Sequence, residues 1–265
     1  MIGVGQKKYV PDDAFENYLE VNGMGDSIPL NDSVFTSLID TVTHLDINGM
    51  FLPQQITDLT GSEEFISLIF LDVSNHNLIV VDVSLNTNLK YLYLSTQNVN
   101  QLILPDSNQL LELSFGFNYI TAIDVSQHTN LTLLDCAFNG ITTLDVSNNN
   151  SLQSLISQDN PLTYLDIRNG NNQNMIDFLC FDNPNLTCIN VDNAVWSTTN
   201  WTVTNGNIDA QHYFSTNCPP PAAIEEHTTN KELFRTIDIL GRETKNEPLF
   251  YLYNDGTVEK RIIIE

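Results

Sequence analysis

Four aspartates recur in this sequence at multiples of 21 residues, and a column of such carboxylates could bind a metal ion. They are Asp82, Asp124, Asp145 and Asp166. Calcium is bound in proteins by several carboxylate and carbonyl oxygens, so these residues are weak candidates for a calcium site, although the DxDxDG spacing of a calcium-binding loop is absent. The alternative is that each aspartate accepts a hydrogen bond from a serine or backbone group of its own turn.

The sequence offers little for catalysis. The five histidines are scattered, and none stands near a nucleophile or a second metal ligand in the sequence: His44, His76, His128, His212 and His227. There is no CxxC pair, and the motifs GxSxG, HExxH and the phosphate-binding loop are absent. We therefore expect a protein that is not an enzyme and that has no cofactor.

An internal repeat sets the spacing of the aspartates. Apolar anchors follow one another at alternating distances of 10 and 11 residues, which gives a period of 21: Leu71, Val81, Leu92, Leu102, Leu113, Ile123, Leu134, Leu144, Leu155 and Leu165. Residues 110–120, 131–141 and 152–162 each follow the pattern LxxLxLxxNxL, with Phe115, Cys136 and Ser157 at its sixth position. A second extended segment such as Ile123-Asp-Val-Ser126 completes the unit. This pattern is typical of leucine-rich repeats.

A single unit of this kind cannot fold alone. About six buried aliphatic side chains stabilise it by roughly 1.5–3 kcal/mol each, whereas ordering its backbone costs about 1–2 kcal/mol per residue. Stacking of coils about 4.8 Å apart supplies the missing burial and the backbone hydrogen bonds. The sequence therefore predicts a mainly β repeat solenoid, a right-handed coil of about 21-residue units.

The asparagine of each unit has a predicted structural role. Asn118, Asn139 and Asn160 should point inward and pair with buried backbone groups of the turn. An apolar replacement would leave those groups unpaired, at about 1–3 kcal/mol each.

The residues that alternate with the anchors should be exposed on the strand side of the solenoid. They are Phe70, Asp72, Tyr91, Tyr93, Glu112, Ser114, Asp135 and Ile156. Aromatic residues and carboxylates on a rigid sheet suit recognition of a protein or glycan, so Tyr91, Tyr93 and Asp135 are candidate binding residues. Phe117 and Phe138, just before the asparagines, are also candidates, or else they form an inward aromatic row.

Both ends of the repeat should be capped. Residues 11–20 place Phe15, Tyr18 and Leu19 at helical spacing with acidic residues in the first turn, which predicts an N-terminal helix. Residues 42–47 form a weaker extended segment that begins the stacking.

The predicted domains follow from these caps. We divide the chain into an N-terminal extension and helical cap (1–41), the solenoid (42–192), a C-terminal cap (193–218), a Pro-rich linker (219–227) and a small C-terminal β module (228–265). The last coil is longer than the others, and Leu179 is expected in the place of Leu155.

The charge of the chain excludes several kinds of partner. It holds 33 acidic and 10 basic residues, a formal net charge of −23, which disfavours nucleic-acid phosphates and anionic lipid surfaces. No run of 18 apolar residues occurs, so no membrane-spanning segment is expected. We expect a monomer.

From Tyr9 to Cys218 the chain resembles secreted leucine-rich-repeat proteins of Bacteroidota. The similarity is carried by the opening YVPDDAFENYLE, by repeated LDVSxN units, and by residues 186–192 and 197–201 followed by a late cysteine. It covers about four fifths of the chain. This resemblance implies a protein that is secreted or held at the outer cell surface.

Residues 228–265 resemble the type A C-terminal sorting domain of the type IX secretion system, through residues 236–243 and 249–264. The resemblance implies that the secretion machinery is a partner, and it places the sorting motif at Gly241, Arg242, Asp255, Gly256 and Lys260. Two features depart from the family: the module is short and lacks the usual YPNP-like start, and no recognisable signal peptide is present. Residues 1–6 could be the tail of a signal peptide or a disordered N-terminus.

The same tail can be interpreted without the family. Residues 233–240, 249–253 and 258–264 are strand-like, and Asn254-Asp-Gly256 offers a hairpin turn. A module of about 38 residues buries little core, and the prolines after Cys218 predict a stiff linker before it.

The four cysteines divide into two pairs. Cys188 and Cys218 bracket the closing segment and would form a disulfide in an extracellular protein, or stay reduced otherwise. Cys136 and Cys180 should lie two coils apart, near 10 Å, which is too far for a disulfide.

These features favour an extracellular or surface-attached recognition protein that binds a protein or glycan through its strand side and is exported by its C-terminus. The alternative is a structural or adhesive matrix component that holds divalent cations on its acidic surface.

Overall fold

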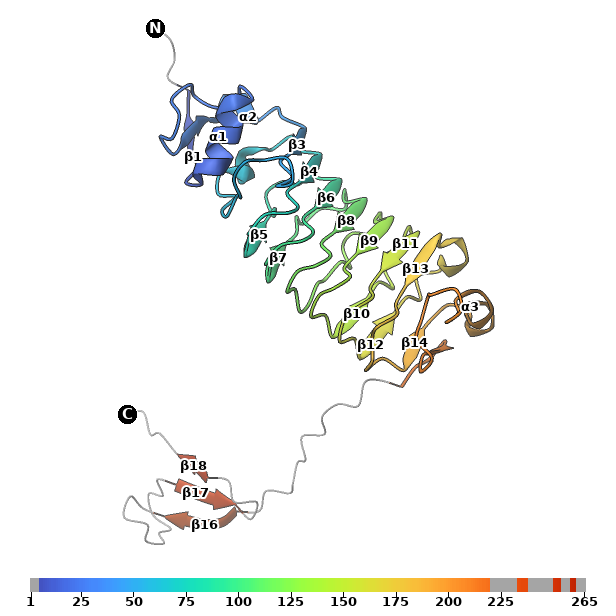
Figure 1. Ribbon diagram of the computed structural model, residues 1–265. Coiled ribbons are helices and arrows are strands. Elements are labelled where there is room, and N and C mark those ends of the chain that lie inside the picture. Colours follow the sequence, from blue (N-terminus) through green and yellow to red (C-terminus); the bar gives the residue numbers. More distant parts are fainter. Residues whose placement is uncertain (1–4, 220–232, 238–249, 254–257, 261–265) are drawn as a thin grey trace. The chain divides into compact units, whose positions relative to one another are not determined.

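The chain divides into two compact units, Met1–Pro219 and Pro220–Glu265. A computed structural model describes residues 5–219, 233–237, 250–253 and 258–260 (Figure 1). The first unit holds the repeats and the second holds the C-terminal segment.

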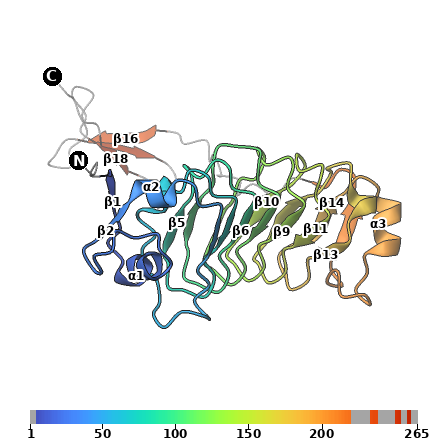
Figure 2. The same ribbon diagram turned by 90° about the horizontal axis from the view of Figure 1, so that it is seen from above.

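The first unit is a leucine-rich-repeat solenoid, as the 21-residue period predicts. Successive coils each contribute a three-residue strand to one parallel sheet of seven strands (Figures 1 and 2). In order across this sheet the strands are β13 (Asp177–Leu179), β11 (Ser154–Ile156), β9 (Leu133–Asp135), β8 (Glu112–Ser114), β6 (Tyr91–Tyr93), β4 (Phe70–Asp72) and β3 (His44–Asp46). The middle residue of each of these seven strands is buried, and the predicted anchors build one continuous core, in which only Leu102 and Ile123 are partly buried.

A second row of strands lies on the other side of the coils, and it is interrupted. It consists of a pair, β5 (Val80–Asp82) with β7 (Gln101–Ile103), and a four-stranded sheet of β10 (Thr143–Asp145), β12 (Tyr164–Asp166), β14 (Cys188–Asn190) and β15 (Tyr213–Ser215). The strand expected at residues 123–126 does not form. The preceding coil has Ile103 and Pro105 where its neighbours have the Asp and Ser of the turn. That coil lacks the Asp–Ser bond of its neighbours but still forms β7, and residues 123–126 keep their own Asp124–Ser126 bond.

A ladder of buried polar side chains joins each coil to the one before it. Asn118 Nδ2 donates to the carbonyls of Leu94 and Phe115, both at 2.9 Å, and its Oδ1 accepts from Val99 N at 3.0 Å. Asn139 and Asn160 repeat this arrangement. The side chains therefore satisfy backbone groups in the core that the strands leave unpaired.

Three further residues extend this ladder, and two of them are not asparagines. Asn183 continues it in the longer last coil, where it donates to Ser157 O and Cys180 O. Gln97 and His76 occupy the equivalent place in the earlier coils: Gln97 accepts from Leu78 N, and His76 Nδ1 accepts from Ile56 N at 3.1 Å while its Nε2 faces Ile47 O at 2.5 Å. A side chain with one donor and one acceptor serves this position whatever its type.

The buried histidines make stability depend on pH. Burial lowers the pKa of His76, His128 and His212 below the usual 6.5, so the unfolded chain takes up protons near that pH before the folded chain does. The free energy of unfolding should therefore fall as the pH is lowered from about 7.5 to about 5. Urea titrations should show a smaller fall for His76→Gln, which keeps a donor and an acceptor, than for the natural chain. An equal fall in both proteins would contradict the role of His76.

The N-terminal cap is built around a helix whose carboxylates hold backbone N–H groups. It comprises β1 (Lys7–Tyr9), α1 (Asp13–Val21), β2 (Ser33–Phe35) and α2 (Thr36–Ile39). Asp12 caps α1 through the N–H groups of residues 14 and 15, and its second oxygen accepts from Thr57 N at 2.8 Å. The fully buried Glu16 accepts from Asn31 N and Asp32 N. The predicted helix is confirmed, and its acids also anchor the neighbouring loops.

The last coil is shifted relative to the expected register. Leu155 pairs with Phe178, so Phe178 is the buried anchor and the expectation of Leu179 at this place is wrong. Two extra residues of the coil lie before the strand, around the 3-10 helix η2 (Asn172–Asn174), and a third lies between β13 and β14. An earlier 3-10 helix, η1 (Ser62–Glu64), lies near the N-terminal cap. After β14, α3 (Ala194–Asn200) leads to Trp201, whose ring lies 4.3 Å from that of Phe178 and closes the core.

The second unit contains an antiparallel sheet of β16 (Leu233–Ile237), β17 (Phe250–Tyr253) and β18 (Val258–Lys260). These strands fall within the three segments that the sequence marks as extended. Lys260 ends β18. The hairpin turn at residues 254–256 and the residues Gly241, Arg242, Asp255 and Gly256 lie outside the described part of the chain.

Candidate binding surface

The outward positions of the seven-stranded sheet form one continuous surface, called here the strand face. It consists of the first and third residue of each strand: His44, Asp46, Phe70, Asp72, Tyr91, Tyr93, Glu112, Ser114, Leu133, Asp135, Ser154, Ile156, Asp177 and Leu179. Parallel pairing in register places equivalent residues of successive coils side by side. The period of the sequence thus becomes columns of neighbouring side chains about 4.8 Å apart.

Aromatic rings cluster at the N-terminal half of the strand face. The ring of Phe70 stacks on His44 with centroids 4.1 Å apart, and it lies 6.4 Å from Tyr91 and 5.5 Å from Tyr93. Phe70 and both tyrosines are half-buried. Three strands therefore present these four rings together, as an amphipathic surface with polar hydroxyl tips.

Carboxylates alternate with these rings across the sheet. The register places Asp72 beside Tyr93, and Tyr91 beside Glu112. The Tyr93 hydroxyl donates to Glu112 Oε2, and the burial of Tyr93, together with this hydrogen bond, raises its pKa. The tyrosine is consequently fixed in its neutral form with its ring held against the acid.

Asp135 lies further along the same face. It accepts hydrogen bonds from Ser114 Oγ at 3.1 Å and from Ala137 N at 3.2 Å. Burial raises the pKa of Asp135, and these two hydrogen bonds offset the rise only in part.

Phe117 and Phe138 form a stacked pair at the corner that follows the strands. Their ring centroids are 4.0 Å apart with an angle of 10° between planes, and 53% of Phe117 is exposed. The pair is therefore outside the core and does not form the inward row that was the alternative. Both residues have positive φ, which is uncommon for non-glycine residues.

Positive φ is a property of this corner in every coil and not of the phenylalanines alone. Residues with φ between 54° and 63° precede each member of the polar ladder: Asn75, Thr96, Phe117, Phe138, Asp159 and Asp182. The conformation turns the chain so that the next side chain points inward. It therefore carries no separate evidence of a site.

The recurring aspartates bind their own turns. Asp82, Asp124 and Asp145 accept from the N–H of the serine two residues later at 2.8–2.9 Å, and Asp166 accepts from Arg168 N and forms an ion pair with that side chain at 2.5 Å. Ile103 interrupts the column. Among the described residues the acidic, His or Cys side chains that come together as a possible metal group are Asp13, Glu16 and Asp32 in the N-terminal cap, and none of the four aspartates belongs to it.

Two of the four cysteines are joined. Cys188 and Cys218 form a disulfide that closes the C-terminal cap, whereas Cys136 and Cys180 are separate thiols in the core. Burial raises the pKa of both thiols, that of Cys180 to about 12. Both therefore remain protonated at neutral pH, which disfavours a nucleophilic role.

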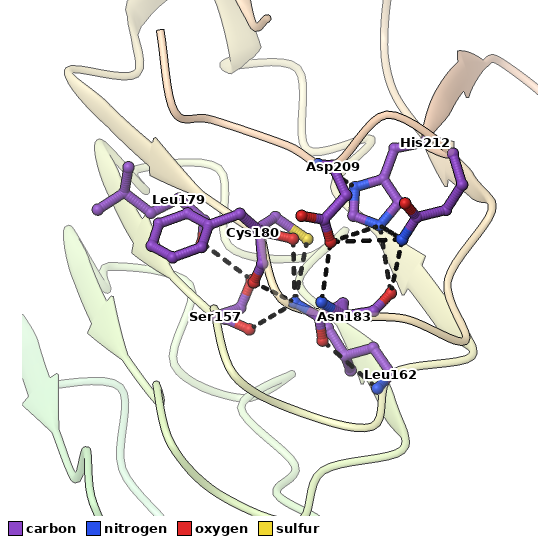
Figure 3. Close-up of polar contacts among 9 residues, drawn as sticks. Ser157, Leu162, Leu179, Cys180, Asn183, Asp209 and His212 are labelled. Carbon is purple, nitrogen blue, oxygen red and sulfur yellow. Dashed lines mark hydrogen bonds and ion pairs between the residues drawn. The ribbon is translucent and has the colours of Figure 1, made fainter. Parts of the chain in front are cut away.

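His212 and Asp209 meet beside Asn183 at the C-terminal end of the ladder (Figure 3). Asp209 Oδ2 accepts from Asn183 N at 3.1 Å, and His212 Nε2 lies 3.3 Å from Asn183 O and 3.7 Å from Asp209 Oδ2. His212 Nδ1 accepts from Asp209 N, so its proton is on Nε2. This His–Asp pair, distant in sequence from Asn183, holds the cap on the last coil.

The solenoid unit is strongly acidic. Residues 1–219 contain 24 of the 33 acidic residues of the chain but four of its ten basic ones: Lys7, Lys8, Lys90 and Arg168. Lys7 pairs with Asp26, Lys8 with Glu63 and Glu64, and Arg168 with Asp166. None of these ion pairs involves the strand face.

None of the described helices is long and apolar enough to cross a bilayer. No family model matches the chain, and no curated protein matches it.

Parts of the chain are similar to solved structures of other proteins. The functional domain of InlJ from Listeria monocytogenes, which includes a cysteine ladder, is 26% identical over 72% of this chain, which spans 53% of that structure, with a TM-score of 0.38. Internalin C2 from the same organism is 20% identical over 71% of this chain and 99% of its own, with a TM-score of 0.44. A leucine-rich-repeat protein of Leptospira interrogans is 20% identical over 58% and 50% of the two chains, with a TM-score of 0.42.

Proposed function

We propose that this protein is a non-catalytic binding protein whose strand face binds an extracellular protein partner. The observation that supports this proposal is the aromatic cluster of His44, Phe70, Tyr91 and Tyr93, held on one rigid sheet at the solvent boundary. Aromatic residues are the commonest energetic centres of protein interfaces. Backbone pairing fixes their positions before binding, so little conformational freedom is lost when a partner docks.

A defined probe tests this function. Random twelve-residue peptides selected on the immobilised full chain should lose affinity by roughly tenfold or more in Tyr91→Ala/Tyr93→Ala, because hot-spot aromatic residues each contribute about 2 kcal/mol or more. Tyr119→Ala, which removes an exposed tyrosine outside the strand face, is the matched control and should bind normally. Peptides that bind the double variant as tightly as the natural chain would refute a role for the strand face. Circular dichroism melts establish that both variants are folded.

We further propose that residues 228–265 are an export signal read by the type IX secretion machinery and that the protein is secreted or held at the cell surface. Support comes from the sequence resemblance and from the three short antiparallel strands in a unit separate from the solenoid. A three-stranded module of this size has little core of its own, which suits recognition by other proteins.

Truncation tests the export proposal. In a host with type IX secretion, the full chain should reach the medium or cell surface, whereas a chain that stops after Ala223 should be retained in the periplasm. A periplasmic reporter fused to residues 220–265 should be exported as well. Equal localisation of the full and truncated chains would mean that residues 228–265 are not a sorting signal.

A further inference from the structure

The strand face combines aromatic rings and carboxylates but has no lysine or arginine. Of its fourteen residues, five are acidic (Asp46, Asp72, Glu112, Asp135 and Asp177) and none is Lys or Arg. Lys90, which immediately precedes β6, makes no ion pair in the part of the chain that the structure describes. The negative charge of this face is therefore left for something outside the protein to balance.

The local geometry suits a planar or compact cation. Tyr91 lies beside Glu112 and Tyr93 beside Asp72 in the ladder, so a group that contacts either ring meets a carboxylate in the next strand. Cations bind over aromatic faces within about 6 Å of the centroid, and guanidinium groups also pair with carboxylates through two hydrogen bonds. Asp135, one strand beyond Ser114, extends the row of acceptors.

A metal ion fits this surface less well than a protein cation does. Calcium takes six to eight oxygen ligands around one point, whereas the carboxylates of the strand face do not converge into any group of three among the described residues. They are instead distributed over successive strands, at intervals that several side chains of one extended peptide could match.

We propose that the partner segment bound by the strand face is positively charged, with arginine or lysine side chains seated between the rings of Tyr91 and Tyr93 and the carboxylates of Asp72, Glu112 and Asp135. This inference rests on the proposed function and specifies the chemistry of the partner. The charge of the solenoid unit also steers such a segment toward it over a distance of about one Debye length.

Synthetic peptides of eight residues that alternate Gly with Arg, and their Gly–Glu counterparts, test the inference on the full chain. The Arg peptide should bind and the Glu peptide should not. Asp72→Asn/Glu112→Gln/Asp135→Asn should weaken binding of the Arg peptide by about tenfold or more, as expected from loss of several charge-assisted contacts. The matched control Asp82→Asn/Asp124→Asn/Asp145→Asn removes the same charge from the other side of the coils and should change affinity by less than about twofold.

The outcomes separate this inference from the proposed function. Equal weakening by both triple variants would mean that diffuse charge binds the peptide, and it would overturn the inference. So would calcium-induced stabilisation that is lost in the strand-face variant, because the carboxylates would then serve a metal ion. If library-selected peptides depend on Tyr91 and Tyr93 but contain no excess of Arg or Lys, the binding function stands and the charged partner is refuted.

Discussion

Replacing Asn118 with Leu should lower the free energy of unfolding by about 3–9 kcal/mol. Asn118 is 6% exposed and satisfies two carbonyls and one N–H from two different coils. Leucine has a similar size but no polar atoms, so three buried backbone groups lose their partner at about 1–3 kcal/mol each. Urea denaturation followed by circular dichroism measures the change.

Two further variants isolate the hydrogen bonds from the change in side-chain type. Asn148→Leu makes the same substitution at an exposed position in the same solenoid and should shift stability by no more than about 0.5 kcal/mol. Asn118→Gln introduces the residue type that stands at this place one coil earlier, as Gln97, and should recover part of the loss. If Asn118→Leu is as stable as the natural chain, the ladder does not support the coils.

Removing the disulfide should cost about 3–4 kcal/mol in the stability of the C-terminal cap. Cys188 and Cys218 are separated by 30 residues. In the chain-entropy account, closing a loop of that length lowers the entropy of the unfolded state, which stabilises the folded state by about 3–4 kcal/mol. The loop contains α3 and Trp201, which cover Phe178 at the end of the core. Loss of the bond should therefore open the cap before the central coils unfold.

Hydrogen exchange of Cys188→Ala/Cys218→Ala gives the location of the effect. Protection should fall mainly in residues 187–218 and remain in β8 and β9. A reducing agent should destabilise the natural chain by a similar amount and leave the double variant unchanged, which serves as the control. Faster exchange spread evenly over all coils, or no change at all, would contradict a disulfide that acts on the cap.

Much of the fold follows from the repeat alone. In the seven-stranded sheet, the 21-residue spacing of the anchors identifies the buried residue of each strand from Leu71 to Leu155, because a side-chain period of two in a three-residue strand leaves one face for the core. The same alternation identifies Tyr91 and Tyr93 as outward residues. Because the anchors recur in every coil, one irregular coil does not obscure the pattern.

Positions where a coil departs from the pattern could not be predicted in this way. Nothing in the local sequence distinguishes Phe178 from Leu179 as the anchor, since both are apolar and the choice depends on where the extra residues of the coil are accommodated. His76 and Gln97 belong to the polar ladder because of the backbone groups they face, which are about 20 residues away in the chain.

The sequence by itself determined the repeat class, the buried face of the strands and the acidic character of the solenoid, because each of these follows from residue type and spacing along the chain. Only the tertiary structure decided that Tyr93 meets Glu112, that Phe117 stacks on Phe138 outside the core, and that the aspartates of the turns bind their own backbone. These contacts depend on the register between coils and on side-chain direction. Both are set by the packing of residues that are distant in sequence.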